Sequence, residues 1–154
     1  MLGIFKSKAK PFFDIRENDL IVKAIQHCEQ NTSGEIRVYI EAKNPLVSPM
    51  ERAMVIFTGL KMHLTEERNG VLLYIAHKHK EVALIADEGI YKKVGQQFWD
   101  DEVKKMLEKF KNEQLADGIQ HCVLEVGQVL KQTFPYKSGI DKNELPDEIV
   151  FGKL

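Results

Sequence analysis

The sequence lacks any apolar run approaching the roughly 20 residues that a membrane-spanning helix needs. In residues 1–10 the lysines follow the apolar residues, which is not the order of a signal peptide, so we expect a frayed tail there. The alternative is a weak membrane-surface contact in which Leu2, Ile4 and Phe5 insert beneath those lysines. In neither case do we expect a membrane span.

An excess of charge of one sign is also missing. Lysine and arginine number 22 against 23 acidic residues, and the formal net charge is −1. With no zinc-finger, RNP or Arg-rich signature, this balance excludes a general attraction to nucleic acid. The 154 residues, 44% hydrophobic and 29% charged, suit one soluble domain. We expect a monomer in the cytoplasm, with peripheral membrane association as the alternative.

Cysteine is scarce, and recognised catalytic signatures are missing. Cys28 and Cys122 form no CxxC pair and lie on the apolar faces of predicted helices, so both are interpreted as small core residues in a reducing compartment. His77 and His79 have no third metal ligand nearby and are interpreted as part of a solvated turn. No P-loop, GxSxG, HExxH, Asp-x-Asp or Cys-x₅-Arg pattern occurs. Sequence motifs alone therefore do not indicate that this chain is an enzyme.

Three stretches have the character of buried strands. Residues 35–41 alternate, with Ile36, Val38 and Ile40 expected on one face, whereas 70–76 and 81–87 are apolar runs bounded by Gly and charge. A predicted helix separates the first two strands, so they should be parallel, and the short turn 77–80 makes the third antiparallel to the second. The expected fold is α/β: a three-layer α/β/α sandwich with a small mixed sheet, a βαβ unit followed by a β-hairpin.

Helix start signals are clear at two places. Asp14 with Glu17 resembles a capping box, and Ser48 followed by Pro49 is a strong helix start. In the second helix the spacing predicts an apolar stripe facing the core. Its members are Met50, Ala53, Met54 and Phe57.

Further helices are expected over 90–98, 100–110 and 113–134, the last of them ended by Pro135. The middle one should place Val103, Met106, Leu107 and Phe110 inward and begin with an acidic first turn over Asp100–Glu102. Trp99 should be a core residue or a half-exposed lid.

We divide the chain into an N-terminal tail, 1–13, a domain, 14–134, and a C-terminal tail, 135–154. The C-terminal tail is either disordered or docks through the β-formers Ile149 to Phe151 on the domain or a sheet edge.

The topology brings polar residues to one edge of the predicted sheet. The end of the third strand should lie beside the starts of the first two, near a helix N-terminus. The residues gathered there are the candidate ligand-binding residues Glu35, Arg68, Asn69, Gly70, Asp87, Glu88 and Gly89. Oxygen-rich clusters suit Ca²⁺, so Asp87, Glu88 and Glu35 are the candidate metal ligands. Structural roles are the alternative: Glu35 at a strand edge, Asn69 and Gly70 in a positive-φ turn, and Asp87 as a helix cap.

The order and spacing of three segments resemble the TPM domain family. They are Gly34-Glu35-Ile36 opening a strand, Asn69-Gly70-Val71-Leu72-Leu73 opening another, and a third strand ending at the turn before Gly89. The resemblance covers roughly 14–134 and implies the α/β fold. It also implies Ca²⁺ binding and weak acid phosphatase activity, both attributed to some members. This chain departs from the family pattern at Arg68, Ile85 and Tyr91, where acidic residues are frequent.

Three functions follow as hypotheses. The first is a non-enzymatic adaptor that binds a protein partner in a membrane-associated complex, because family members are tied to assembly, repair or regulation of such complexes. The second is a divalent-cation-dependent acid phosphatase. The third is a Ca²⁺-binding regulatory domain without catalysis.

Overall fold

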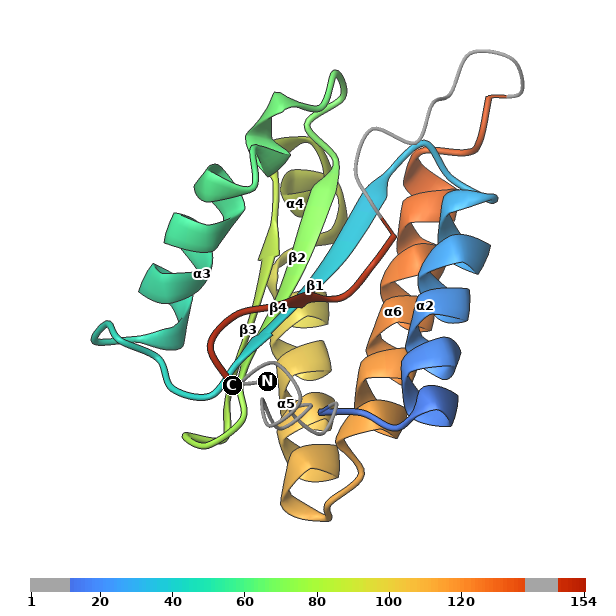
Figure 1. The fold of residues 1–154 in the computed structure, drawn as a ribbon. Helices are drawn as coiled ribbons and strands as arrows, with labels where there is room; N and C mark the ends of the chain where they lie inside the picture. Colours follow the sequence, from blue (N-terminus) through green and yellow to red (C-terminus); the bar gives the residue numbers. More distant parts are fainter. Residues whose placement is uncertain (1–11, 138–146) are drawn as a thin grey trace, which may run out of the picture.

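The structure is a computed structural model that describes residues 12–137 and 147–154. Helices and strands alternate in the first half of the chain, and three consecutive helices follow the β2–β3 hairpin (Figure 1). The elements are α2 (Ile15–Glu29), β1 (Glu35–Glu41), α3 (Pro49–Gly59), the 3₁₀ turn η1 (Met62–Leu64), β2 (Gly70–Ala76), β3 (Glu81–Ala86), α4 (Glu88–Val94), α5 (Gln96–Lys111), α6 (Leu115–Thr133) and β4 (Val150–Phe151).

The strands form an open mixed sheet in the order β3-β2-β1-β4. β1 and β2 are parallel, with Glu35 opposite Gly70, and β2 and β3 are an antiparallel hairpin, with Val71 opposite Ala86. The predicted α/β fold, the parallel pair and the hairpin are thereby confirmed. The third strand ends one residue earlier than predicted, because Asp87 is already the N-cap of α4.

The C-terminal segment supplies a fourth strand. β4 pairs in parallel with β1, with Val150 opposite Tyr39. The pairing is extended by the Gly152 N–H, which donates to the Ile40 carbonyl at 2.8 Å, and by the Ala42 N–H, which donates to the Lys153 carbonyl at 2.8 Å. Of the two alternatives for Ile149 to Phe151, docking at a sheet edge is therefore correct. The predictions for residues 1–11 and 138–146 lie outside the described residues.

Side-chain alternation along the strands creates two apolar cores. Ile36, Val38 and Ile40 of β1 face α2 and α6, as predicted, and join the larger core with residues of α5. On the other face Leu72 and Tyr74 of β2 pack against α3. Figure 1 shows α3 on one side of the sheet and α2 and α6 on the other. All seven residues of β2 are buried because both faces are covered, which confirms β2 as the most buried strand.

Both predicted helix caps are present. The Asp14 carboxylate accepts from the Glu17 N–H at 2.7 Å while the Glu17 side chain accepts from the Asp14 N–H at 3.1 Å. Ser48 Oγ accepts from the Glu51 N–H at 3.1 Å. Each cap satisfies an otherwise unpaired donor at the helix start, so the boundary could be read from local sequence.

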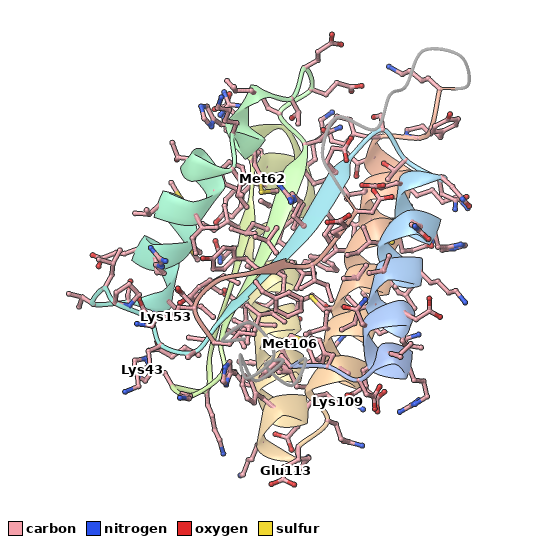
Figure 2. All side chains as sticks on the ribbon, in the orientation of Figure 1. Lys43, Met62, Met106, Lys109, Glu113 and Lys153 are labelled. Carbon is pink, nitrogen blue, oxygen red and sulfur yellow. The ribbon has the colours of Figure 1, made fainter. Side chains whose placement is uncertain are left out.

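The predicted stripe on α3 is wrong for its two methionines. Met50 and Met54 are 48% and 51% exposed, whereas Ala53, Ile56 and Phe57 face the core. α3 packs mainly on β2 and β3 and buries a narrow apolar stripe, so the two methionines lie on its solvent-exposed side. Figure 2 shows how the side chains of the described residues surround this two-faced sheet.

The predicted boundaries in the segment 88–111 also need correction. Gly95 adopts φ 92°, which ends α4 at Val94, and α5 begins at Gln96 rather than Asp100. The acidic first turn expected over Asp100–Glu102 is therefore wrong, because these residues lie further along the helix and Glu102 is buried. Leu107, expected to face inward, is 40% exposed, whereas Trp99 is a core residue.

The packing of α2 on α6 is unusually close. A Cβ atom at Gly127 would overlap Cys28 Sγ, and the Cys28 thiol donates to the Val123 carbonyl at 3.2 Å. Both cysteines are buried, as predicted, and burial raises the pKa of the Cys28 thiol to about 11 and that of Cys122 well above its usual value. Burial and a raised pKa both disfavour the reactive thiolate form. Within the described residues, no helix combines the length and the apolar character needed to cross a bilayer.

Candidate functional site

The predicted edge of the sheet assembles around the hairpin and the loop before β2. The Asp87 N–H donates to the Gly70 carbonyl at 2.9 Å, and the Gly89 N–H donates to the Arg68 carbonyl at 2.8 Å. Gly89 is required here, because a Cβ would overlap the carbonyl oxygen of Glu67 and approach that of Arg68. The end of β3 and the start of β2 are thus joined through their backbones.

Arg68 is the centre of this edge. Its Nε and Nη2 donate to the two oxygens of Asp87 at 2.7 and 2.9 Å, and its Nη1 lies 3.3 Å from Glu88. The hydrogen bonds that the guanidinium donates to Asp87, together with the charge of both carboxylates, raise the pKa of Arg68. Arg68 itself has φ 51°, so it, and not Asn69 or Gly70, adopts the positive φ of this turn. Bidentate pairing of this kind fixes geometry as well as charge.

Asp87 also caps α4, since its carboxylate accepts from the Glu88 N–H at 2.8 Å. One carboxylate therefore serves the ion pair and the helix start together. The structural alternative for Asp87, a helix cap, is present in the structure, and the same carboxylate also pairs with Arg68.

Glu35 does not join Asp87 and Glu88. β2 lies between β1 and β3, so the ends of these two strands are separated by about 10 Å. Among residues 12–137 and 147–154, no group of three or more His, Cys, Asp or Glu side chains could hold a metal ion. The assignment of Asp87, Glu88 and Glu35 to a metal stays a prediction.

Glu35 belongs instead to an acidic cluster at the start of β1. Burial, a hydrogen bond with Asp147 and the charge of Glu35 raise the pKa of the Glu29 carboxyl to about 11. Arg37, also buried, lies within the field of Glu148, Glu29 and Glu35, but desolvation outweighs them and lowers its pKa. Glu29 and Asp147 were not predicted as part of a site, because Glu29 ends a helix and Asp147 lies in the expected C-terminal tail.

Asn69 is buried between these groups. Its Nδ2 lies 3.4 Å from Ser33 Oγ, whose hydroxyl contacts Glu67 at 3.3 Å. Its Oδ1 has no hydrogen-bond partner among the described residues. Asn69 thus links the start of β2 to the segment before β1 and leaves one acceptor unused.

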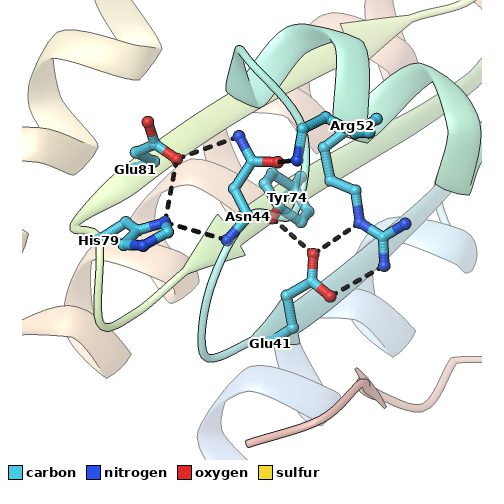
Figure 3. Close-up of polar contacts among 7 residues, drawn as sticks. Glu41, Asn44, Arg52, Tyr74, His79 and Glu81 are labelled. Carbon is cyan, nitrogen blue, oxygen red and sulfur yellow. Dashed lines mark hydrogen bonds and ion pairs between the residues drawn. The ribbon is translucent and has the colours of Figure 1, made fainter.

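A second polar network lies at the opposite end of the sheet and was not predicted (Figure 3). Glu41 accepts from Arg52 Nε and Nη2 at 2.7 and 2.9 Å and from the Tyr74 hydroxyl at 2.6 Å. Burial would raise the pKa of Glu41, but these hydrogen bonds outweigh burial and hold it below its usual value. This is the carboxyl end of the parallel strands, where α/β folds bind ligands. Here the charged groups satisfy one another, so the network ties α3 to the sheet.

Beside it, Asn44 holds the loop after β1. Its N–H donates to His79 Nδ1 at 3.1 Å, its Nδ2 donates to Glu81 at 3.2 Å, and its Oδ1 accepts from the Leu46 N–H at 2.8 Å. Figure 3 shows that these contacts connect the β1–α3 loop to the β2–β3 turn.

A third network joins α5 and α6. Glu102, which is buried, and Glu125, which is half-buried, share Lys105, whose Nζ lies 3.2 Å from Glu102 and 2.8 Å from Glu125. Burial and the hydrogen bond with Glu125 raise the pKa of Glu102 to about 7. A small cavity of about 100 Å³ adjoins these residues and Cys122.

The comparisons with known proteins agree with this fold. The family model described as the TPM domain matches residues 9–129, which is most of the chain. The chain belongs to the TPM domain family. The BA42 protein of the psychrophilic bacterium Bizionia argentinensis, solved by NMR, is 37% identical to it with a TM-score of 0.84, over 95% of this chain and 99% of that one.

Two more distant structures share the fold alone. The N-terminal domain of a protein from P. gingivalis is 15% identical with a TM-score of 0.63, over 80% of each chain. The N-terminal domain of cg2496 from Corynebacterium glutamicum is 11% identical with a TM-score of 0.58, over 79% of this chain and 76% of that one. The search of curated proteins found no match.

Proposed function

We propose that this TPM domain is a non-enzymatic adaptor that binds another protein through the outer face of α3. The observation that carries the proposal is the apolar character of that face. Met50, Met54 and Val55 are 48%, 51% and 54% exposed, and Glu51 is the charged residue among the exposed residues of the helix. Exposed apolar side chains gathered on one face mark interaction surfaces.

A groove beside α3 extends this surface. It has a volume of about 480 Å³ and lies between α3 and α5, with Val82 and Ala83 of β3 at its floor. Met50 and Val103 stand on its two sides, and α5 adds Asp100 and Lys104. An amphipathic partner helix fits these features, because methionines adapt to varied apolar side chains and the charges of α5 can fix its orientation.

A phosphatase is the weaker candidate. Arg68 already holds both oxygens of Asp87, and two positions that are often acidic in the family are occupied here by Ile85 and Tyr91.

We propose that the protein partner of the adaptor belongs to a membrane-associated complex and that this chain acts as a cytoplasmic monomer.

The test is affinity purification from the source cells with the intact chain and with a Met54→Glu, Val55→Glu variant. Leu124→Glu on α6, 37% exposed in the wild-type chain, is the matched control. We expect a partner that the wild type and Leu124→Glu retain and that the double variant loses, followed by a measured Kd for the recombinant pair. Identical partner sets for all three folded proteins would refute binding through α3.

A further inference from the structure

We propose that a basic corner of the molecule, distinct from the α3 face, docks on the surface of an anionic lipid bilayer. The basic corner consists of the exposed lysines Lys43, Lys78, Lys80 and Lys153. They come from three segments: the β1–α3 loop, the β2–β3 turn and the residues after β4. The inference does not depend on the proposed protein partner.

Backbone hydrogen bonds gather these segments at one end of the sheet. The Lys78 N–H donates to the Ala42 carbonyl at 2.8 Å, and the Ala42 N–H donates to the Lys153 carbonyl at 2.8 Å. Lys43 follows Ala42 directly, and Figure 2 shows Lys43 and Lys153 close together at this end. Lysines far apart in sequence are thereby held as one positive group.

The carboxylates of the same segments do not cancel this charge. Glu41 is buried and neutralised by Arg52, through the bidentate pair described above. Glu81 is half-buried, contacts Asn44 and lies 3.7 Å from His79. The lysines therefore present a net positive surface, which the anionic headgroups of a bilayer attract by roughly 1 kcal/mol per lysine, or about fivefold in partition coefficient each.

Two exposed aliphatic residues favour a lipid surface over another polyanion as the binding partner of the basic corner. Leu46 and Val47, at the tip of the β1–α3 loop, are 42% and 92% exposed. Aliphatic side chains beside lysines suit shallow insertion at the headgroup boundary, whereas nucleic-acid surfaces use arginine and stacking aromatics. The four cationic residues of the basic corner are all lysines, and the ring of the neighbouring Phe151 lies beside that of Phe13.

The loop is already held in one conformation. Asn44, only 7% exposed, hydrogen-bonds to Leu46, His79 and Glu81, so little ordering remains to be done on binding. Preorganised contacts lose less free energy to immobilisation.

The experiment is flotation of the full chain with vesicles of phosphatidylcholine alone or with phosphatidylglycerol at about one third, in 0.1 M salt. We expect binding to the anionic vesicles only. The variant Lys43→Gln, Lys78→Gln, Lys80→Gln should lower the partition coefficient about 100-fold, and Leu46→Ser, Val47→Ser about tenfold. The control Lys92→Gln, Lys111→Gln, Lys131→Gln makes the same change in net charge at exposed sites elsewhere and should retain binding.

All variants keep residues 1–11, so a loss reports on the basic corner. Equal losses in the two lysine variants, or unchanged binding of the corner variant, would overturn the inference. So would displacement of the protein from vesicles by an equimolar DNA duplex, which would indicate a nucleic-acid surface. The Met54→Glu, Val55→Glu protein tests the two proposals separately. It should lose its protein partner. Any decrease in its vesicle binding should not exceed the decrease expected from its two added negative charges.

Discussion

Arg68 and Asp87 form a bidentate ion pair between the loop before β2 and the first residue after β3. Arg68 occupies the place beside Asp87 that a cation would take at an acidic edge. The same carboxylate caps α4, so the pair connects a turn, a strand and a helix. In the absence of a competing ligand, this ion pair holds the edge together and occupies the Asp87 carboxylate.

Replacing Arg68 by Asp should make the carboxylates of this edge available to Ca²⁺. The change removes the competing guanidinium and adds a hard oxygen ligand beside Asp87 and Glu88. We expect millimolar or weaker Ca²⁺ affinity in the wild type and tighter binding in Arg68→Asp. Amide chemical-shift titration of both proteins measures this. Equal affinities, or shifts clustering away from residues 35, 69 and 87–90, would argue that the edge is only a capped turn.

Hydrolysis of a generic phosphomonoester by the purified protein should stay at background, with or without divalent cations. The sequence offers no nucleophile signature, and Asp87 is held by Arg68. A steady-state assay with p-nitrophenyl phosphate checks this. Robust turnover that disappears in Asp87→Ala or Glu88→Ala would establish a phosphatase instead.

The Glu41 network should respond more to losing one partner than to losing both charges. Arg52→Met leaves a buried carboxylate with the Tyr74 hydroxyl, and we expect a loss of about 3–5 kcal/mol in the free energy of unfolding. The double variant Glu41→Leu, Arg52→Met removes the buried charge and should be less destabilised than Arg52→Met. Urea denaturation compares them. A double variant that is the less stable of the two would contradict this view of the network.

Gly127→Ala should destabilise the packing of α2 against α6. The added methyl group overlaps Cys28 Sγ, and overpacking of this kind costs about 1–3 kcal/mol. Gly59→Ala at the end of α3, where a Cβ would have no neighbour within 4 Å, is the matched control and should be neutral or slightly stabilising. Thermal unfolding of the two variants measures the difference. Equal melting temperatures would mean that the helices separate without penalty.

Stability should fall as pH rises above about 4.5, because of Glu29. Its pKa is about 11 in the folded chain against an ordinary 4.5, so between these values the folded state binds a proton that the unfolded state releases. One proton corresponds to about 1.4 kcal/mol per pH unit, and we expect this slope over only the lower part of the interval, since Glu29 is partly exposed and solvent screening brings its folded pKa closer to the ordinary value. Denaturation between pH 5 and 9 gives the slope. Glu29→Gln should flatten it, whereas the exposed control Glu108→Gln should not; equal slopes in all three proteins would contradict the role of Glu29.

Local chemistry allowed much of the fold to be predicted from the sequence. The alternation in β1, the apolar runs of β2 and β3, the short turn between them and the caps at Asp14 and Ser48 each depend on residues within a few positions of one another. Strand pairing then followed from connection lengths, because a crossover helix makes parallel neighbours and a tight turn makes antiparallel ones. The meeting of Arg68 with Asp87 was accessible in the same way.

The sequence by itself thus determined strands β1 to β3, the hairpin, the capped starts of α2 and α3, and the edge where Arg68 meets Asp87. Only the tertiary structure decided what depends on distant neighbours. Met50 and Met54 have core-like spacing, but their exposure depends on how α3 lies on the sheet. Glu29 meets Glu35 and Asp147, and Glu41 meets Arg52 and Tyr74, across helix, strand and tail, where no spacing rule applies. Burial and charge pairing are properties of the assembled layers, because each depends on which surfaces remain after every element has packed.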